Sequence, residues 1–191
     1  MEGVIALDQV AVEPSLEARF EALVTRHRDR AVRLAWRLVG GDLAAAEDVT
    51  QEALVRAFRG LRSFRGDAQL DTWFYRIVAR QAYSYVRWRR VRERFAATDP
   101  DQAGDPAPGP EGDPLLRERI GRALDALSRG QREAFVLVHM EGFTLREAAE
   151  IMGKADGTVH SHLHRALSRL RSELEGTLGT REERDRDPAT P

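Results

Sequence analysis

Hydrophobic residues recur along this chain at intervals of three and four, the spacing that places them on one face of an α-helix. Helix ends are marked by capping residues and by glycine, as at Ser15, Asp42 and the pair Gly40 and Gly41. On this pattern, helices are predicted at residues 15–39, 42–61, 71–95, 115–127 and 129–140. No stretch alternates hydrophobic and polar residues with a period of two, so we predict an all-α fold without a sheet.

Toward the C-terminus the pattern predicts two further helices joined by a tight turn. Gly153 ends the first of them, and Asp156 or Thr158 is expected to cap the second. Ala149, Gly153 and Val159 supply a small residue where the helices cross, a glycine for a left-handed turn and a branched residue that anchors the second helix. This spacing is typical of a helix-turn-helix, whose second helix enters the DNA major groove.

The outward face of that second helix is rich in hydrogen-bond donors, and no acid occurs between Gly157 and Glu173. The candidate residues for reading duplex DNA are Thr158, His160, Ser161, His162 and Arg165. Such side chains can contact base edges and phosphates in a groove. An ordinary helical hairpin with a solvated face is the structural alternative.

Charge is segregated along the 191 residues, although 30 basic and 31 acidic residues nearly cancel to a net charge of −1. Residues 96–114 hold five prolines, five acids and no basic residue, so they are predicted to form a flexible linker. This linker separates two small helical domains, predicted at 15–95 and 115–176. We expect residues 1–14 to be a flexible arm and residues 177–191 a disordered tail.

The composition excludes several classes of protein. The chain contains no cysteine, which rules out disulfides and thiolate metal sites. No hydrophobic run approaches the roughly 20 residues that span a bilayer, and the first residues lack the basic and apolar regions of a signal peptide. We therefore expect a cytoplasmic protein without a membrane-inserted segment. Neither paired carboxylates, nor a nucleophile with its base, nor a glycine-rich phosphate loop is recognisable, so we predict no enzyme, no cofactor and no metal.

The third helix is predicted to carry a continuous basic face. Its members recur at steps of four, three, four, three and four, namely Arg76, Arg80, Tyr83, Arg87, Arg90 and Arg94. Residues 16–95 hold 17 arginines and 10 acids, a surplus of seven positive charges. A face of one sign repels itself unless a polyanion lies along it.

Aromatic residues lie close to this basic face, among them Phe64 and Trp73. We assign Phe74 and Tyr85 to the core and expect others to offer a surface on which unpaired bases can stack. Basic and aromatic residues together favour single-stranded DNA over intact duplex. A solvated amphipathic helix with core aromatics is the alternative.

The second helix has a different outward face, which is acidic and partly apolar. Its residues are Asp48, Gln51, Glu52 and Val55. Leu43 and Phe58 are assigned to the opposite, inner side of this helix. An acidic face repels phosphates, so it fits a protein partner better than DNA. An ordinary solvated face is equally consistent with these residues.

Taken in order, these features resemble a bacterial sigma factor of the sigma-70 family, in its small extracytoplasmic-function class. The resemblance covers residues 16–174, and its motifs are AEDVTQEALVRAF at 46–58, SFRGDAQLDTWFYRIVAR at 63–80 and LDALSRGQREAFVLVHMEGFTLREAAEIMGKADGTVHSHLHRALSRLR at 124–171. They are similar to the family's polymerase-binding helix, its reader of the −10 promoter element and its reader of the −35 element. The resemblance implies a transcription initiation factor built from sigma regions 2 and 4.

The resemblance also implies roles for particular residues. Contact with the clamp of core RNA polymerase is implied for Asp48, Gln51, Glu52 and Val55. Contact with the −10 element is implied for Phe64, Trp73, Arg76, Arg80, Tyr83, Arg87 and Arg90. Contact with −35 duplex DNA is implied for Thr158, His160, Ser161, His162 and Arg165. Region 4 would also touch the polymerase flap, the acidic linker would thread through the polymerase channel, and an anti-sigma protein is a further implied partner.

The chain departs from the family at two places. The family usually has asparagine at the position of Arg80 and basic residues at those of His160 and His162, which leaves the base preference open.

Two other functions fit part of the chain. A free-standing helix-turn-helix regulator would explain the last part of the chain and would be expected to dimerise. A metal site is the other alternative. Residues two apart on a helix point in nearly opposite directions, so His160 and His164 are the pair that could share an ion.

Overall fold

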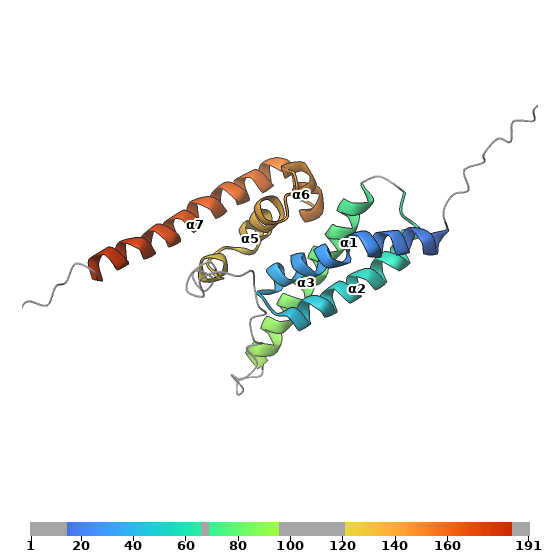
Figure 1. Ribbon diagram of the computed structural model, residues 1–191, viewed down its shortest axis with the longest axis horizontal. Coiled ribbons are helices and arrows are strands. Elements are labelled where there is room, and N and C mark those ends of the chain that lie inside the picture. The colour runs from blue at the N-terminus through green and yellow to red at the C-terminus, as the bar shows by residue number, and fades with distance from the viewer. Residues whose placement is uncertain (1–14, 66–68, 96–120, 185–191) are drawn as a thin grey trace, which may run out of the picture.

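The computed structural model describes residues 15–65, 69–95 and 121–184 (Figure 1). Every regular element among these residues is a helix, which confirms the predicted all-α fold. The predicted arm at 1–14, the predicted linker at 96–114 and residues 115–120 of the helix predicted at 115–127 lie outside them. In the same described ranges, no helix is long and apolar enough to cross a membrane.

The first half of the chain forms three helices, α1 (Leu16–Val39), α2 (Leu43–Leu61) and α3 (Leu70–Phe95). Their ends follow the predicted capping chemistry. The Ser15 side chain accepts a hydrogen bond from the backbone N–H of Ala18, and Asp42 accepts one from Ala45 at 2.9 Å. Gly40 closes α1 in the left-handed region, with φ 94°. Each of the three helices packs against the other two, so they form one bundle with a shared apolar interior.

The second half contains a short helical segment at 121–125, then α5 (Arg129–Phe135), the π-helical turn η1 (Val136–Met140), α6 (Leu145–Met152) and α7 (Asp156–Arg184). Capping boxes begin both α5, at Ser128 with Gln131, and α6, at Thr144 with Glu147. The helix predicted at 129–140 therefore exists. Its last turn widens, because the Glu141 N–H donates to the Val136 carbonyl five residues earlier, at 2.9 Å.

Helices α6 and α7 form the predicted helix-turn-helix. Gly153 ends α6 in the left-handed region with φ 62°, and Val159 is fully buried where it anchors α7. The predicted cap is wrong, because Asp156 is already the first residue of α7 and the Ala155 carbonyl accepts from Thr158 N–H at 2.9 Å. Helix α7 also continues to Arg184, beyond residue 176, where a disordered tail was predicted to follow.

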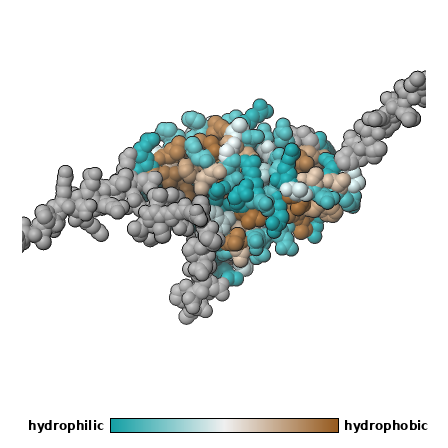
Figure 2. Space-filling view, in the orientation of Figure 1, coloured by the Kyte–Doolittle hydropathy of each residue, from teal (hydrophilic) through white to brown (hydrophobic). Residues whose placement is uncertain are grey.

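The two halves of the chain lie against each other. Helix α3 packs on α6 and α1 contacts η1, and one cluster of buried residues runs through both halves. Figure 2 shows one face of the molecule with hydrophilic residues across its middle and hydrophobic patches to either side. The picture of two domains joined by a tether is therefore incomplete, since the domains are also docked on one another.

Candidate nucleic-acid interface

The N-terminal half of α7 presents most of the predicted duplex-reading side chains to solvent. Thr158, His160, Ser161 and Arg165 are exposed, while Val159 between them is buried. The Ser161 hydroxyl donates to the Gly157 carbonyl at 2.9 Å, so it is engaged on its own helix. Of these, Thr158 lies in the first turn of α7, where backbone N–H groups and the helix dipole favour a phosphate.

His162 is placed differently from the other four. It is half-buried, and its ring packs so closely on α5 that a Cβ added at Gly130 would lie 2.8 Å from it. A side chain at position 130 would therefore push the His162 ring aside. Over the described ranges, no three His, Cys, Asp or Glu side chains gather in a manner that could hold a metal ion.

The predicted basic face of α3 is divided in the structure. Arg80, Arg87 and Arg90 are exposed as expected. Arg76 is half-buried and its Nε donates to the Glu150 backbone carbonyl of α6, at 2.7 Å. Tyr83 is only 8% exposed, and the Arg129 guanidinium of α5 lies 3.7 Å from the centroid of its ring. Two members of the predicted DNA face thus contact the other half of the chain.

Phe64 and Trp73 meet where α2 leads into α3. Their ring centroids are 5.1 Å apart, and a Cβ added at Gly60 would lie 2.9 Å from the Trp73 ring. Farther along α3, Trp88 is 55% exposed, with the Arg92 guanidinium 4.8 Å from its ring centroid. The predicted site omitted Trp88, although its place among the arginines of α3 marked it as an aromatic of the same kind.

The core assignments of the aromatic residues were partly right. Phe74 is fully buried as predicted, whereas Tyr85 is half-buried and packs on the edge of the core. Tyr75, which was not assigned to the core, is fully buried. The predicted inner side of α2 also included too many residues, because Leu43 is 44% exposed and Phe58 is 37% exposed.

The outward face of α2 is open to solvent. Its predicted residues Asp48, Gln51, Glu52 and Val55 are all exposed. Glu52 pairs with Arg56 at 2.8 Å, one turn along the same helix. Val55 is 38% exposed, so this acidic face also presents apolar area to solvent.

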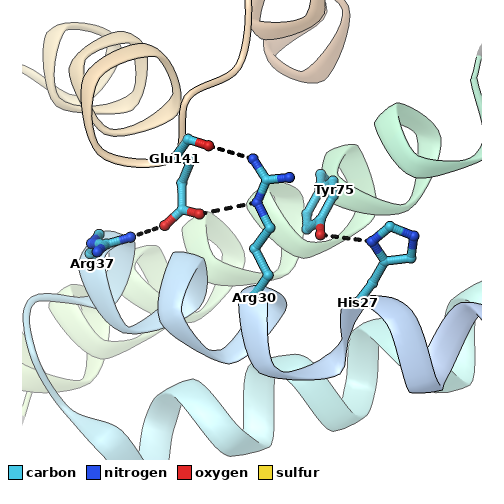
Figure 3. A network of polar contacts seen from close by, with 5 residues as sticks. All are labelled: His27, Arg30, Arg37, Tyr75 and Glu141. Atoms are coloured by element: carbon cyan, nitrogen blue, oxygen red, sulfur yellow. Dashed lines mark hydrogen bonds and ion pairs between the residues drawn. The ribbon is translucent and has the colours of Figure 1, made fainter.

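A buried polar network joins the two halves (Figure 3). Glu141, which follows η1, is 3% exposed at its side chain and pairs with both Arg30 and Arg37 of α1. Arg30 reaches the carboxylate through Nε, with 3.3 Å to Oε2, and also donates to the Glu141 carbonyl. The Arg30 guanidinium lies 4.1 Å from the centroid of Phe143, whose ring packs on Tyr75 at 5.1 Å. Nothing local in the sequence marked Glu141, because its partners lie more than 100 residues away.

The same network continues into the bundle. The Tyr75 hydroxyl and the His27 Nδ1 are 2.9 Å apart, and the His27 Nε2 lies 3.0 Å from Asp71. Burial lowers the pKa of His27, although the Asp71 carboxylate acts in the opposite direction. Burial also raises the pKa of the Tyr75 hydroxyl. Both side chains are therefore held neutral around neutral pH.

A cavity of about 390 Å³ lies between α3, α5, α6 and α7. Its polar lining comes from both halves, and comprises Arg80, Tyr83, Arg129, Glu133, Lys154 and His162. Burial raises the pKa of Glu133 to about 7, against the pull of Arg129, and burial also raises that of Tyr83. The Tyr83 hydroxyl and the Glu133 carboxyl interact electrostatically, but within the described part of the chain that hydroxyl has no partner in hydrogen-bond geometry.

Comparison with known proteins gives two family matches in the order of the two halves. Residues 23–92 match the model of Sigma-70 region 2, and residues 117–170 match that of Sigma-70, region 4. Among curated proteins, the ECF RNA polymerase sigma factor SigM of Mycobacterium tuberculosis is 35% identical over 161 residues, which cover 84% of this chain and 79% of SigM. The ECF RNA polymerase sigma-E factor of Escherichia coli K12 is 32% identical over 183 residues, which cover 88% of this chain and 94% of that protein.

A third relative is longer than this chain. The ECF RNA polymerase sigma factor SigE of Mycolicibacterium smegmatis is 36% identical over 160 residues, and the match covers 81% of this chain but 61% of SigE. Two solved structures are similar in fold. The sigma factor RpoE in complex with the anti-sigma factor NepR from Bartonella quintana has a TM-score of 0.69 and 29% identity, over 82% of this chain and 97% of RpoE. CnrH in complex with the cytosolic domain of CnrY has a TM-score of 0.63 and 26% identity, over 84% of this chain and 90% of CnrH.

Proposed function

Because this chain belongs to the sigma-70 family of RNA polymerase sigma factors, in its extracytoplasmic-function class, we propose that it binds core RNA polymerase and directs it to specific promoters. The observation that carries this proposal is the pairing of two surfaces on one chain. Region 2 supplies an exposed acidic face on α2 and a basic, aromatic α3, and region 4 supplies a helix-turn-helix. We assign region 2 to 15–95, region 4 to 115–176 and the connection to the acidic residues 96–114.

The polymerase-binding surface in this proposal is the outward face of α2. Asp48, Gln51 and Glu52 provide polar and acidic contacts, and Val55 provides apolar area beside them. A mixed face of this kind suits a protein partner, because apolar burial supplies affinity while the charges fix the orientation. The polymerase clamp is the partner we assign to it, and the flap is assigned to region 4.

The surface for the −10 element is α3 with the loop before it. The exposed cations Arg80, Arg87 and Arg90 would follow the phosphates of an opened strand. Phe64 and Trp73, already in contact with each other, would stack on or hold a flipped base. Arg76 and Tyr83 belong to the same surface and would join it once region 4 moves away.

The surface for the −35 element is the first part of α7. Thr158, His160, Ser161 and Arg165 are placed to meet the major groove, with His162 at the inner edge of the same surface. Together the two surfaces would let one chain hold a duplex element and an opened element of a promoter.

We place this activity in the cytoplasm, where RNA polymerase acts, and propose an anti-sigma protein as a further partner. The anti-sigma partner is proposed from the two similar structures, in which RpoE is bound by NepR and CnrH by the cytosolic domain of CnrY.

The test is association with core polymerase. Purified chain and core enzyme are mixed and run on a size-exclusion column, and a sigma factor is expected to migrate with the core as a stoichiometric complex. A free-standing regulator would instead migrate separately and bind duplex DNA without polymerase. Migration of the chain separately from core polymerase would overturn the proposal.

A further inference from the structure

We propose that the cavity between α3, α5, α6 and α7 is a binding site for a small molecule that carries a phosphate or diphosphate group. Three exposed cations, Arg80, Arg129 and Lys154, would hold the phosphate oxygens together with the half-buried His162. The inference goes beyond the proposed function, because it adds a ligand that promoter recognition does not use.

The cavity has the size and the lining of a small-molecule site. Its volume of about 390 Å³ lies within the range of about 300–1,000 Å³ that is typical of such sites. The buried side chains of Ala79 and Ile151, with Met152 beside them, give it an apolar part. The polar groups come from α3, α5, α7 and the turn before α7. An apolar wall with a few convergent polar groups suits an organic molecule that has one charged end.

The charges around the cavity are mostly positive. Within the described ranges, Arg80, Arg129 and Lys154 form no salt bridge. Among the described residues that line the cavity, Glu133 is the one acid, and burial raises its pKa to about 7. Cations gathered around one cavity repel one another unless an anion lies between them. A phosphate group supplies up to two negative charges and three acceptor oxygens, so it can satisfy several of these cations at once.

Arg129 and Tyr83 form one wall of the cavity and both can donate to a ligand. The Arg129 guanidinium lies over the Tyr83 ring, 3.7 Å from its centroid. A guanidinium held on an aromatic ring keeps N–H groups that can bind phosphate oxygens in pairs. The buried Tyr83 hydroxyl has no hydrogen-bond partner among the described residues. A buried donor normally has a partner, and a ligand oxygen would provide one.

Gly130 shapes the wall that His162 forms. Gly130 lies within α5 and is not among the glycines with a positive φ, so its backbone conformation does not require glycine. A Cβ at this position would lie 2.8 Å from the His162 ring. The absence of a side chain at Gly130 therefore lets the ring lie against α5 and line the cavity, where an imidazole N–H can donate to a phosphate oxygen.

The test titrates the full chain with pyrophosphate, ADP and uncharged adenosine at pH 8, in a buffer without phosphate or divalent cations. Isothermal titration calorimetry gives the Kd of each. We expect pyrophosphate and ADP to bind at one site per chain and adenosine not to bind. Tighter binding of ADP than of pyrophosphate would assign the site to an organic phosphate, and the reverse order would assign it to an inorganic one. A Kd weaker than about 1 mM for both, or equal binding of ADP and adenosine, would overturn the proposal.

Two variants remove cations that the proposed function does not assign to DNA. Lys154→Gln and Arg129→Gln should each weaken ADP binding about tenfold, because each removes a charged donor from the cavity. The matched control is Arg146→Gln, which removes a cation from α6 whose side chain is 83% exposed and does not line the cavity. Lys154 is exposed, so its replacement leaves the core intact. Unchanged affinity in Lys154→Gln would overturn the site, and so would an equal loss in the control.

Glu133→Gln tests the charge of the ligand from the opposite direction. At pH 8 the Glu133 carboxyl is mostly ionised, since its pKa is about 7, and glutamine keeps its shape while removing one negative charge from the cavity. We expect ADP to bind about fivefold more tightly to this variant, and the control Glu93→Gln, at a carboxylate that is 61% exposed, to bind ADP as the native chain does. Equal or weaker binding by Glu133→Gln would overturn the assignment of an anion to this cavity.

Discussion

The carboxylate of Glu141 lies against the guanidinium of Arg37, 104 residues away in the chain, and its side chain is 3% exposed. With Arg30 on its other side, this acid anchors region 4 to the first helix of region 2. The stability of the whole docked chain should therefore depend on one residue in a connecting segment.

Replacement of Glu141 by glutamine should destabilise the full chain by about 2 kcal/mol, because Arg30 and Arg37 lose their counter-charge while remaining partly buried. The measurement is the free energy of unfolding from denaturant titration. Asp29→Asn, whose carboxylate is 84% exposed, should change it by less than about 0.5 kcal/mol. Equal stability of the Glu141 variant and the native chain would mean that the ion pair contributes nothing to docking.

The buried carboxyl of Glu133 should make stability fall as pH rises. Its pKa is raised from 4.5 to about 7, so the folded chain binds a proton that the unfolded chain has released between these values. The loss of stability therefore develops between about pH 4.5 and 7 and is complete above the folded-state pKa. Glu133→Gln should remove it and stabilise the chain by on the order of 3 kcal/mol at pH 8, with a much smaller gain at pH 5.

The control for this prediction is Glu93→Gln, since the Glu93 carboxylate is 61% exposed. The stability of this variant should depend on pH in the same way as the stability of the native chain. A gain from Glu133→Gln of equal size at pH 5 and pH 8 would show that packing, and not ionisation, is responsible.

His27 should make stability fall as pH decreases, which is the opposite of the effect of Glu133. Burial lowers its pKa from 6.5, so the folded chain holds the neutral imidazole and loses stability as pH falls through 6.5 toward the folded-state value. In the native chain, this loss partly offsets the stability that protonation of Glu133 adds as pH falls over the same range. Comparison of the native chain with Glu133→Gln between pH 5 and 7 should reveal a profile that rises with pH. A flat profile in that variant would remove His27 as the cause.

The capping residues explain why the helices were predictable and the docking was not. Ser15, Asp42 and Gly40 act on backbone groups within a few residues, so their effect is written in the local sequence. Glu141 and its arginines are ordinary charged residues until the chain brings them together. The pairing of Tyr75 with Phe143 is equally non-local.

The basic face of α3 shows the same limit on what the sequence can predict about the candidate site. The spacing of Arg80, Arg87 and Arg90 predicted their exposure, because it depends on the periodicity of one helix. Tyr83 follows the same spacing but is buried, because α5 places Arg129 over its ring. Periodicity defines a face of a helix, but it does not say what covers that face.

Charge reversal on α2 should abolish binding to core polymerase. The double variant Asp48→Lys, Glu52→Lys changes two exposed carboxylates, so the helical circular dichroism should be unaffected. The matched control is Glu21→Lys, Asp29→Lys, which makes the same change of charge on exposed positions of α1. We expect co-purification with core enzyme to be lost in the first variant and kept in the second. Undiminished binding by the α2 variant would show that this face is solvated and has no role in the complex.

Arg80→Ala should impair promoter melting while sparing the initial complex. Arg80 is exposed, so its loss leaves the core intact, whereas Trp73→Ala would also remove packing on Gly60. We expect the rate of strand opening to fall about tenfold, a loss typical of one contact to an unpaired base. Permanganate footprinting of unpaired thymines measures it. Equal reactivity with native chain and variant would contradict the role of Arg80 at the −10 element.

Run-off transcription with core RNA polymerase on a library of genomic promoters tests the central claim most directly. Core enzyme with this chain is expected to initiate at a defined subset of promoters that share one −35 and one −10 sequence, and core enzyme without it is expected to give none of these transcripts. Identical transcripts with and without the chain would contradict its assignment as an initiation factor.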